Sequence, residues 1–144
     1  MRWQTEDGVV LDVLTSKRRG DDIAMWHDAL GAWAQALSYL DFMLENPIDA
    51  VVRYREGVPV QILAPERAAV HELIVVDMRS GTHRPKPEKS LAQATWLIET
   101  LVGSRPFELV EAIENARRHG PKWRRAIDAS LARRPDVAEM VDRL

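Results

Sequence analysis

The sequence contains no cysteine among its 144 residues. This absence excludes disulfide bonds, thiolate nucleophiles and cysteine-based zinc sites, and it is typical of a cytoplasmic protein. The sequence also lacks an apolar run of about 18 residues, the length that a membrane-spanning helix requires. We therefore expect a cytoplasmic protein that does not associate with a membrane.

The usual signatures of nucleotide, metal and acyl-transfer sites are missing as well. There is no G-x-G-x-x-G, no Walker loop, no H-E-x-x-H and no G-x-S-x-G. The histidines fall in separate predicted elements without metal-ligand spacing, and they are His27, His71, His83 and His119. The sequence therefore predicts no metal and no cofactor, and it favours a protein without catalysis.

What is present is the composition of a globular domain, with 46% apolar and 29% charged residues. The length suits one domain. We predict a single α+β domain over 1–144, with a sheet and two helices in 1–104 and a helical extension in 105–144. The net charge is −2, but residues 1–50 carry four Lys and Arg against nine Asp and Glu. Such an uneven distribution is suited to partner binding or self-association.

The first 45 residues predict a hairpin followed by a long helix. Asp7-Gly8 is a tight-turn pair, and apolar residues alternate after it. Beyond Asp22, apolar residues recur at alternating spacings of three and four, which is typical of an amphipathic helix. This stripe comprises Ile23, Trp26, Leu30, Trp33, Leu37, Leu40 and Leu44. The sequence therefore predicts one long helix over about 22–45.

The middle of the chain predicts a three-strand meander. A second hairpin spans 50–63 and turns at Glu56-Gly57. The apolar run 70–78 is read most simply as a third strand. The segment 65–72 also fits a short helix, and periodicity leaves both structures open.

The last third predicts helices, because prolines and glycines divide it into amphipathic segments. We expect helices over 88–102, 106–118 and 121–133, and a final turn or two from Pro135. The fold class is thus α+β. An antiparallel sheet, made of the N-terminal hairpin and the three-strand meander, carries one long helix on a face and a C-terminal helical segment. This element order resembles the longin and profilin-like arrangement.

Asp77-Met78-Arg79 resembles the acidic-x-Lys motif on a strand of PD-(D/E)xK nucleases, with arginine in place of lysine. The resemblance implies carboxylates that hold Mg²⁺ beside a cation and position water on a phosphodiester. The residues that would do this here are Glu56, Glu72, Asp77 and Arg79. A divergent metal-dependent nuclease is therefore one alternative function.

A cationic loop with two prolines precedes the helix expected from Glu88. Its donors lie just before a helix N-terminus, where backbone N–H groups and the helix dipole favour anions. The candidate partner-binding residues of this loop are Arg79, His83, Arg84 and Lys86. A second candidate surface, on the predicted long helix, consists of Met25, Ala29, Ala32 and Met43.

The segment 117–134 is a second basic region, with Trp123 on the apolar stripe of the predicted helix. Basic residues beside an aromatic ring can bind phosphates and stack on bases. The candidate nucleic-acid-binding residues are Arg118, Lys122, Arg124 and Arg125. Nucleic-acid binding, with the loop 79–86 as an accessory contact, is therefore another alternative function.

Because no set of residues points to bond-making chemistry, the sequence favours a non-catalytic interaction protein of an accessory, regulatory, inhibitor or immunity type. Its partner would be another protein, and a second copy of the same chain is one candidate. Nucleic acid is the other partner considered.

Overall fold

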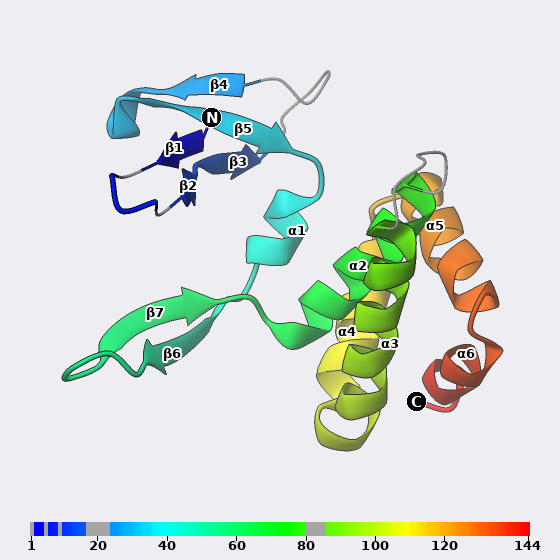
Figure 1. Ribbon diagram of the computed structural model, residues 1–144. Helices are drawn as coiled ribbons and strands as arrows, with labels where there is room; N and C mark the ends of the chain where they lie inside the picture. Colours follow the sequence, from blue (N-terminus) through cyan, green and yellow to red (C-terminus); the bar gives the residue numbers. More distant parts are fainter. Residues whose placement is uncertain (1, 5, 9, 17–23, 80–85) are drawn as a thin grey trace. The chain divides into compact units, whose positions relative to one another are not determined.

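The structure is a computed structural model that describes residues 2–4, 6–8, 10–16, 24–79 and 86–144. Contacts divide the chain into two compact units, which we call unit 1 (Met1–Phe42) and unit 2 (Met43–Leu144). Helices and short sheets are both present, as Figure 1 shows, so the predicted α+β class is confirmed. The single domain stays a prediction.

Unit 1 begins with the predicted hairpin. Strand β1 (Arg2–Gln4) pairs antiparallel with β2 (Val10–Asp12), and Trp3 lies opposite Leu11. Gly8 in the connecting turn has a φ of 81°. Glycine adopts such left-handed angles without a Cβ clash, which is why Asp7-Gly8 predicts the turn correctly.

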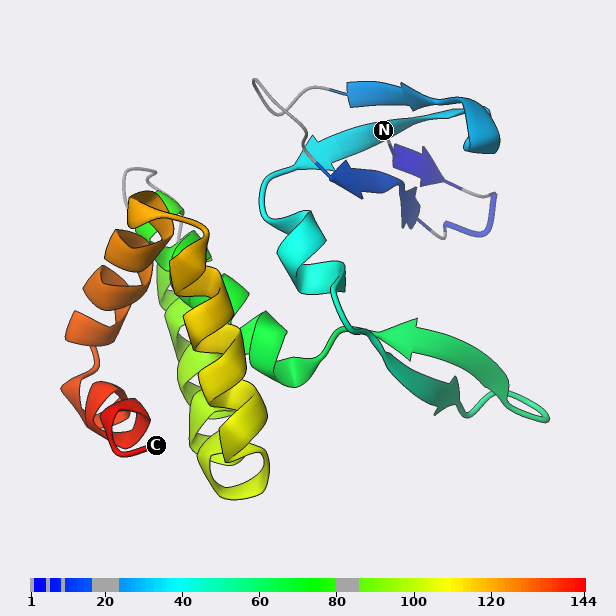
Figure 2. The same ribbon diagram turned by 180° about the vertical axis from the view of Figure 1, so that it is seen from behind.

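A three-stranded mixed sheet follows in unit 1. Figure 2 shows β5 (Ala32–Leu37) between β3 (Leu14–Ser16) and β4 (Ala24–His27). β5 runs parallel to β3 and antiparallel to β4. The prediction of a purely antiparallel sheet was therefore wrong in this part of the chain.

The predicted long helix over about 22–45 is also wrong. Its described residues form β4, a single 3-10 turn η1 (Asp28–Leu30), β5 and the short helix α1 (Leu40–Leu44). Gly31 takes a left-handed φ of 55° and ends η1. β5 then alternates strictly, because its buried residues are Ala32, Ala34 and Ala36. The segment therefore forms a strand, with a two-residue period of burial, although its larger apolar residues recur at helical spacing.

Unit 2 contains the second predicted hairpin. Strand β6 (Ile48–Val52) pairs antiparallel with β7 (Val58–Ile62), with Ala50 opposite Val60. Gly57 has a φ of 97°, which fits the predicted turn. This hairpin is a two-stranded sheet of its own, and the predicted third strand does not join it.

The predicted third strand over 70–78 belongs instead to helix α2 (Pro65–Arg79). The open alternative, a helix beginning near Pro65, was the better interpretation. α2 contacts α3 (Lys86–Ser104), α4 (Pro106–Arg118) and α5 (Pro121–Ala132). A helix covered on several sides has no polar stripe, so its sequence cannot be distinguished from that of a buried strand.

The C-terminal helices are confirmed nearly as predicted. α4, α5 and α6 (Pro135–Asp142) each carry a proline at the start of the first turn. Figures 1 and 2 agree that α2, α3 and α4 lie side by side, and α6 contacts α3 and α5. In the described ranges no helix has the length and apolar character needed to cross a membrane.

Candidate functional site

Two adjacent charged residues are buried where α2 begins. Pro65 occupies the first position of the helix, and the Ala68 N–H donates to the Ala64 carbonyl at 3.0 Å. This places Glu66 and Arg67 in the first turn, where they are only 7% and 5% exposed. Glutamate and arginine are rarely buried to this extent unless they are paired. Their position therefore calls for specific partners.

Those partners come from segments that are distant in sequence. Arg67 Nη1 lies 2.7 Å from Glu45 Oε2, just after α1. Arg105, the residue before α4, places Nη2 3.3 Å from Glu66 Oε1 and Nε 3.4 Å from Glu108 Oε1. The pairs thus connect the start of α2 with the end of α1 and the start of α4.

A cavity of about 200 Å³ lies beside this network. Its lining includes both buried residues of α2, and Glu108 and Glu111 from α4. Within the described part of the chain, Glu66 Oε2 is buried and has no hydrogen-bond partner. A buried oxygen left without a donor costs free energy, and a ligand that donates a hydrogen bond would remove this cost. We therefore take this cavity as the candidate binding site of unit 2.

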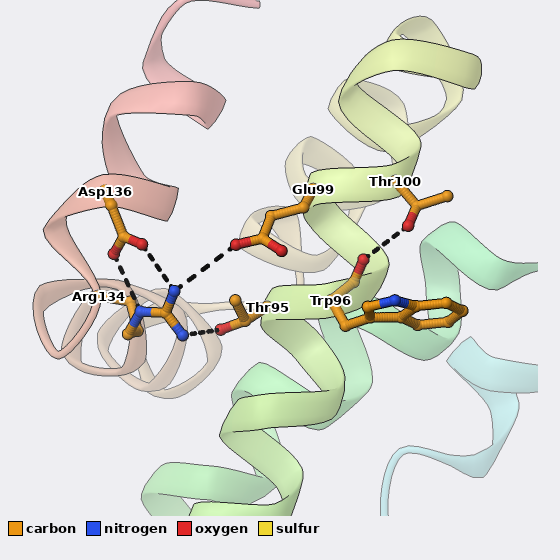
Figure 3. Close-up of polar contacts among 6 residues, drawn as sticks. All are labelled: Thr95, Trp96, Glu99, Thr100, Arg134 and Asp136. Atoms are coloured by element: carbon orange, nitrogen blue, oxygen red, sulfur yellow. Dashed lines mark hydrogen bonds and ion pairs between the residues drawn. The ribbon is translucent and has the colours of Figure 1, made fainter.

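A second cluster surrounds Arg134, between α5 and α6. Figure 3 shows its guanidinium among Asp136, Glu99 and Thr95. Nε and Nη2 donate to the Asp136 carboxylate at 3.0 and 2.6 Å, and Nη1 donates to Thr95 Oγ1 at 3.0 Å. The hydrogen bonds from Arg134 hold the pKa of Asp136 below its ordinary value, and the same contact raises the pKa of Arg134. The cluster positions α6 against α3.

The residues of the predicted nuclease site do not form the expected arrangement. Glu56 lies in the exposed turn of the β6–β7 hairpin, whereas Glu72, Asp77 and Arg79 lie on α2. The motif requires acids on a strand, and α2 is a helix. Glu72 and Asp77 are five positions apart, which places them on different sides of a helix with 3.6 residues per turn. Among the described residues, no three His, Asp or Glu side chains are grouped to hold a metal ion.

The partner surface predicted on one helix stripe is distributed over four elements. Met25 lies on β4, Ala29 on η1, Ala32 on β5 and Met43 on α1. Met25 is 38% exposed, but Ala32 is only 8% exposed. The shared stripe depended on the long helix, which does not form, so these residues do not share one helix face. Their binding to a partner stays a prediction.

In the predicted cationic loop, Arg79 is the last residue of α2 and Lys86 is the first residue of α3. His83 and Arg84 lie outside the described residues. Their binding to a partner stays a prediction.

The basic residues near α5 are placed as the sequence indicated. Arg118 ends α4, and the exposed Lys122, Arg124 and Arg125 lie in the first turns of α5. Trp123 is half-buried and stacks on His119, with ring centroids 4.4 Å apart. Its ring therefore already has a stacking partner within the chain.

The cluster that Arg105 forms with the buried Glu66 and Arg67 was missed in the sequence. The Pro65-Glu66 pair could have indicated it, because proline and an acidic residue are favoured in the first turn of a helix. The burial and pairing of these side chains had no local signal.

Comparison with known families now identifies the class of protein. A family model described as "Nucleotidyltransferase" matches residues 1–118 of the 144. The chain belongs to this nucleotidyltransferase family. No curated protein and no solved structure matches the chain.

This membership corrects the functional prediction. The sequence favoured a non-catalytic interaction protein, with nucleic-acid binding and a nuclease as alternatives, whereas the family is named for an enzymatic group transfer. The family match extends over residues 1–118, whereas the prediction rested on the absence of short motifs.

Proposed function

We propose that this chain takes part in nucleotidyl transfer. In such a reaction an acceptor oxygen attacks the α-phosphorus of a nucleoside triphosphate. A new phosphoester bond forms, the bond to the bridging oxygen breaks, and pyrophosphate leaves with that electron pair. The family match over residues 1–118 is the observation that carries this proposal.

The chemistry is usually supported by carboxylates, because Mg²⁺ binds one or two of them together with substrate phosphates. The described residues do not group three His, Asp or Glu side chains that could hold a metal ion, so we propose no step through a metal. The candidate carboxylate of unit 1 is one whose backbone is fixed by strand pairing.

Among the described residues of unit 1, Asp12 is the carboxylate that lies on a β-strand. It is the last residue of β2, paired opposite Arg2, and β3 begins only two residues later at Leu14. The Val13 carbonyl between these strands accepts from the Gln35 N–H of β5 at 2.8 Å. The pairing of Asp12 with Arg2 and the hydrogen bond of the adjacent Val13 therefore fix the backbone at Asp12, and functional groups on strands are held more precisely than those on loops.

The proposal is tested by incubating the protein with each α-labelled nucleoside triphosphate, Mg²⁺ or Mn²⁺ and a panel of hydroxyl-bearing acceptors. Pyrophosphate release and label transfer are measured together. We expect both to depend on the protein. Asp12→Asn should lower kcat/KM by about 100-fold or more, the effect of losing one preorganised electrostatic group.

Asp49→Asn is the matched control, because Asp49 also lies on a strand and its Oδ1 accepts from Gln61 at 3.3 Å. This variant should retain activity. Circular dichroism of both variants would show whether they fold. Full activity in Asp12→Asn would remove Asp12 from the proposal, and absence of transfer with every nucleotide and acceptor would contradict the proposed function itself.

A further inference from the structure

We propose that the cavity at the start of α2 is a binding site for a small organic cation, specifically a primary alkylammonium group. This inference concerns unit 2 alone and does not depend on the transfer reaction. The cavity has a volume of about 200 Å³. At roughly 30 Å³ for each water molecule, this space equals that of about seven waters. It therefore suits a short amine or the amine-bearing end of a larger molecule.

The charges around the cavity favour a cation. Glu66, Glu108 and Glu111 line it together with Arg67 and Arg105. Among the described residues, the lining has three carboxylates against two guanidinium groups, and Glu45, which pairs with Arg67 outside the lining, brings the net formal charge of the cluster to −2. Both guanidinium groups are already engaged by carboxylates. The excess negative charge is thus available to a ligand, and an anion would be repelled.

The unpartnered oxygen of Glu66 is the independent observation that points to a donor. Glu66 lines the cavity, is more than nine-tenths buried, and uses Oε1 for the ion pair with Arg105. Its Oε2 has no hydrogen-bond partner in the described part of the chain. The terminal torsion of glutamate is soft, so Oε2 can turn to accept from an N–H that enters the cavity. A ligand ammonium would satisfy this acceptor and supply the missing positive charge.

The apolar part of the remaining wall, which also includes Asn46, suits the carbon chain of an amine. Ile48 from β6 and Ala112 from α4 contribute apolar surface beside the carboxylates. A ligand with methylene groups next to its charged nitrogen covers this surface while the nitrogen contacts Glu66. Binding sites commonly combine an apolar lining with a few placed polar groups in this way.

The test is a calorimetric titration of the full chain with putrescine, a four-carbon diamine, without nucleotide. We expect saturable binding of one molecule and a higher melting temperature when the amine is present. Butane-1,4-diol has the same carbon chain without charge and should not bind. Inorganic phosphate should not bind either.

Glu66→Gln should weaken putrescine binding by about tenfold or more, because a hydrogen bond to a charged group is lost. Glu114→Gln is the matched control, since Glu114 is exposed on α4 outside the cavity, and it should bind as the unchanged protein does. If Glu66→Gln does not fold, Glu111→Gln at the exposed edge of the cavity takes its place and should weaken binding by a smaller factor.

Three results of the putrescine titrations would overturn the proposal, and a competition with Mg²⁺ supplies a fourth. The three are equal binding of butane-1,4-diol, unchanged putrescine affinity in both Glu66→Gln and Glu111→Gln, or no saturable binding at millimolar putrescine. Competition by Mg²⁺ at a lower concentration than putrescine would also overturn it, because the site would then be a metal site.

Discussion

Units 1 and 2 differ in what their described elements bury. In unit 2, the helices bury large apolar side chains almost completely, including those of Leu73, Ile74, Ile98, Leu109 and Ile127. In unit 1, the buried residues of the described part are Ala32, Ala34, Ala36 and Phe42. Hydrophobic stabilisation follows the buried apolar area, at about 25 cal/mol for each Å². Unit 2 should therefore hold most of the free energy of unfolding.

The tryptophans of unit 1 illustrate the same difference. Trp26 and Trp33 lie opposite each other on β4 and β5, with ring centroids 5.7 Å apart in an edge-on geometry. They remain 50% and 43% exposed. Cross-strand aromatic pairs fix the register of a sheet and contribute only about 0.2–1 kcal/mol. In unit 1, cross-strand pairing therefore sets how the strands align, while the described strands bury little apolar surface.

The largest effect should come from the core of unit 2. Ile98 is fully buried on α3, and Ile98→Ala should lower the free energy of unfolding by about 2–5 kcal/mol in a denaturant titration. Trp96 on the same helix is 65% exposed, so Trp96→Ala should change that free energy by no more than about 0.5 kcal/mol. Equal losses in the two variants would contradict the burial-based comparison.

Hydrogen exchange compares the two units directly. We expect the backbone amides of β5 to exchange through openings of lower free energy than those of α3, because fewer large side chains must be exposed to free them. Exchange is followed by mass spectrometry of peptides from each element. If β5 and α3 open only together, with one free energy, the difference between the units disappears.

A smaller effect tests the contact between α2 and α5. The buried Ser130 Oγ donates to the Leu73 carbonyl at 2.6 Å. Ser130→Ala should reduce the free energy of unfolding by about 1–2 kcal/mol. The exposed Ser104 donates to the Thr100 carbonyl at 2.8 Å, and Ser104→Ala should be within about 0.5 kcal/mol of the unchanged protein. A larger loss for Ser104→Ala would reverse the expected order.

The smallest effect concerns pH and the end of unit 2. Because the folded-state pKa of Asp136 is lowered by Arg134, the pair stabilises α6 above the ordinary carboxyl pKa of 3.8. That contribution is lost as the pH falls through the lowered pKa. Both side chains are partly exposed, so salt should weaken the effect.

NMR titration of the Asp136 carboxyl group measures this directly. Its midpoint should lie below 3.8, the ordinary value. Arg134→Gln should return the midpoint toward that value. A midpoint at or above it in the unchanged protein would contradict the pairing.

Sequence predicted the helices of the C-terminal region because their limits are local. Pro106, Pro121 and Pro135 each start a helix at a position where the missing N–H has no cost. Both hairpin turns were likewise indicated by Asp7-Gly8 and Glu56-Gly57. These signals require no knowledge of what packs against the segment.

Tertiary structure decided the remainder. The apolar segments of β5 and α2 fit both a strand and a helix, and only their packing partners select one. The cluster around Glu66 could not be predicted from sequence for a related reason. Glu66 and Arg105 are 39 residues apart and meet only after α2 and α4 pack. Composition and turn chemistry are properties of neighbouring residues. The burial of a charge depends on the whole fold around it.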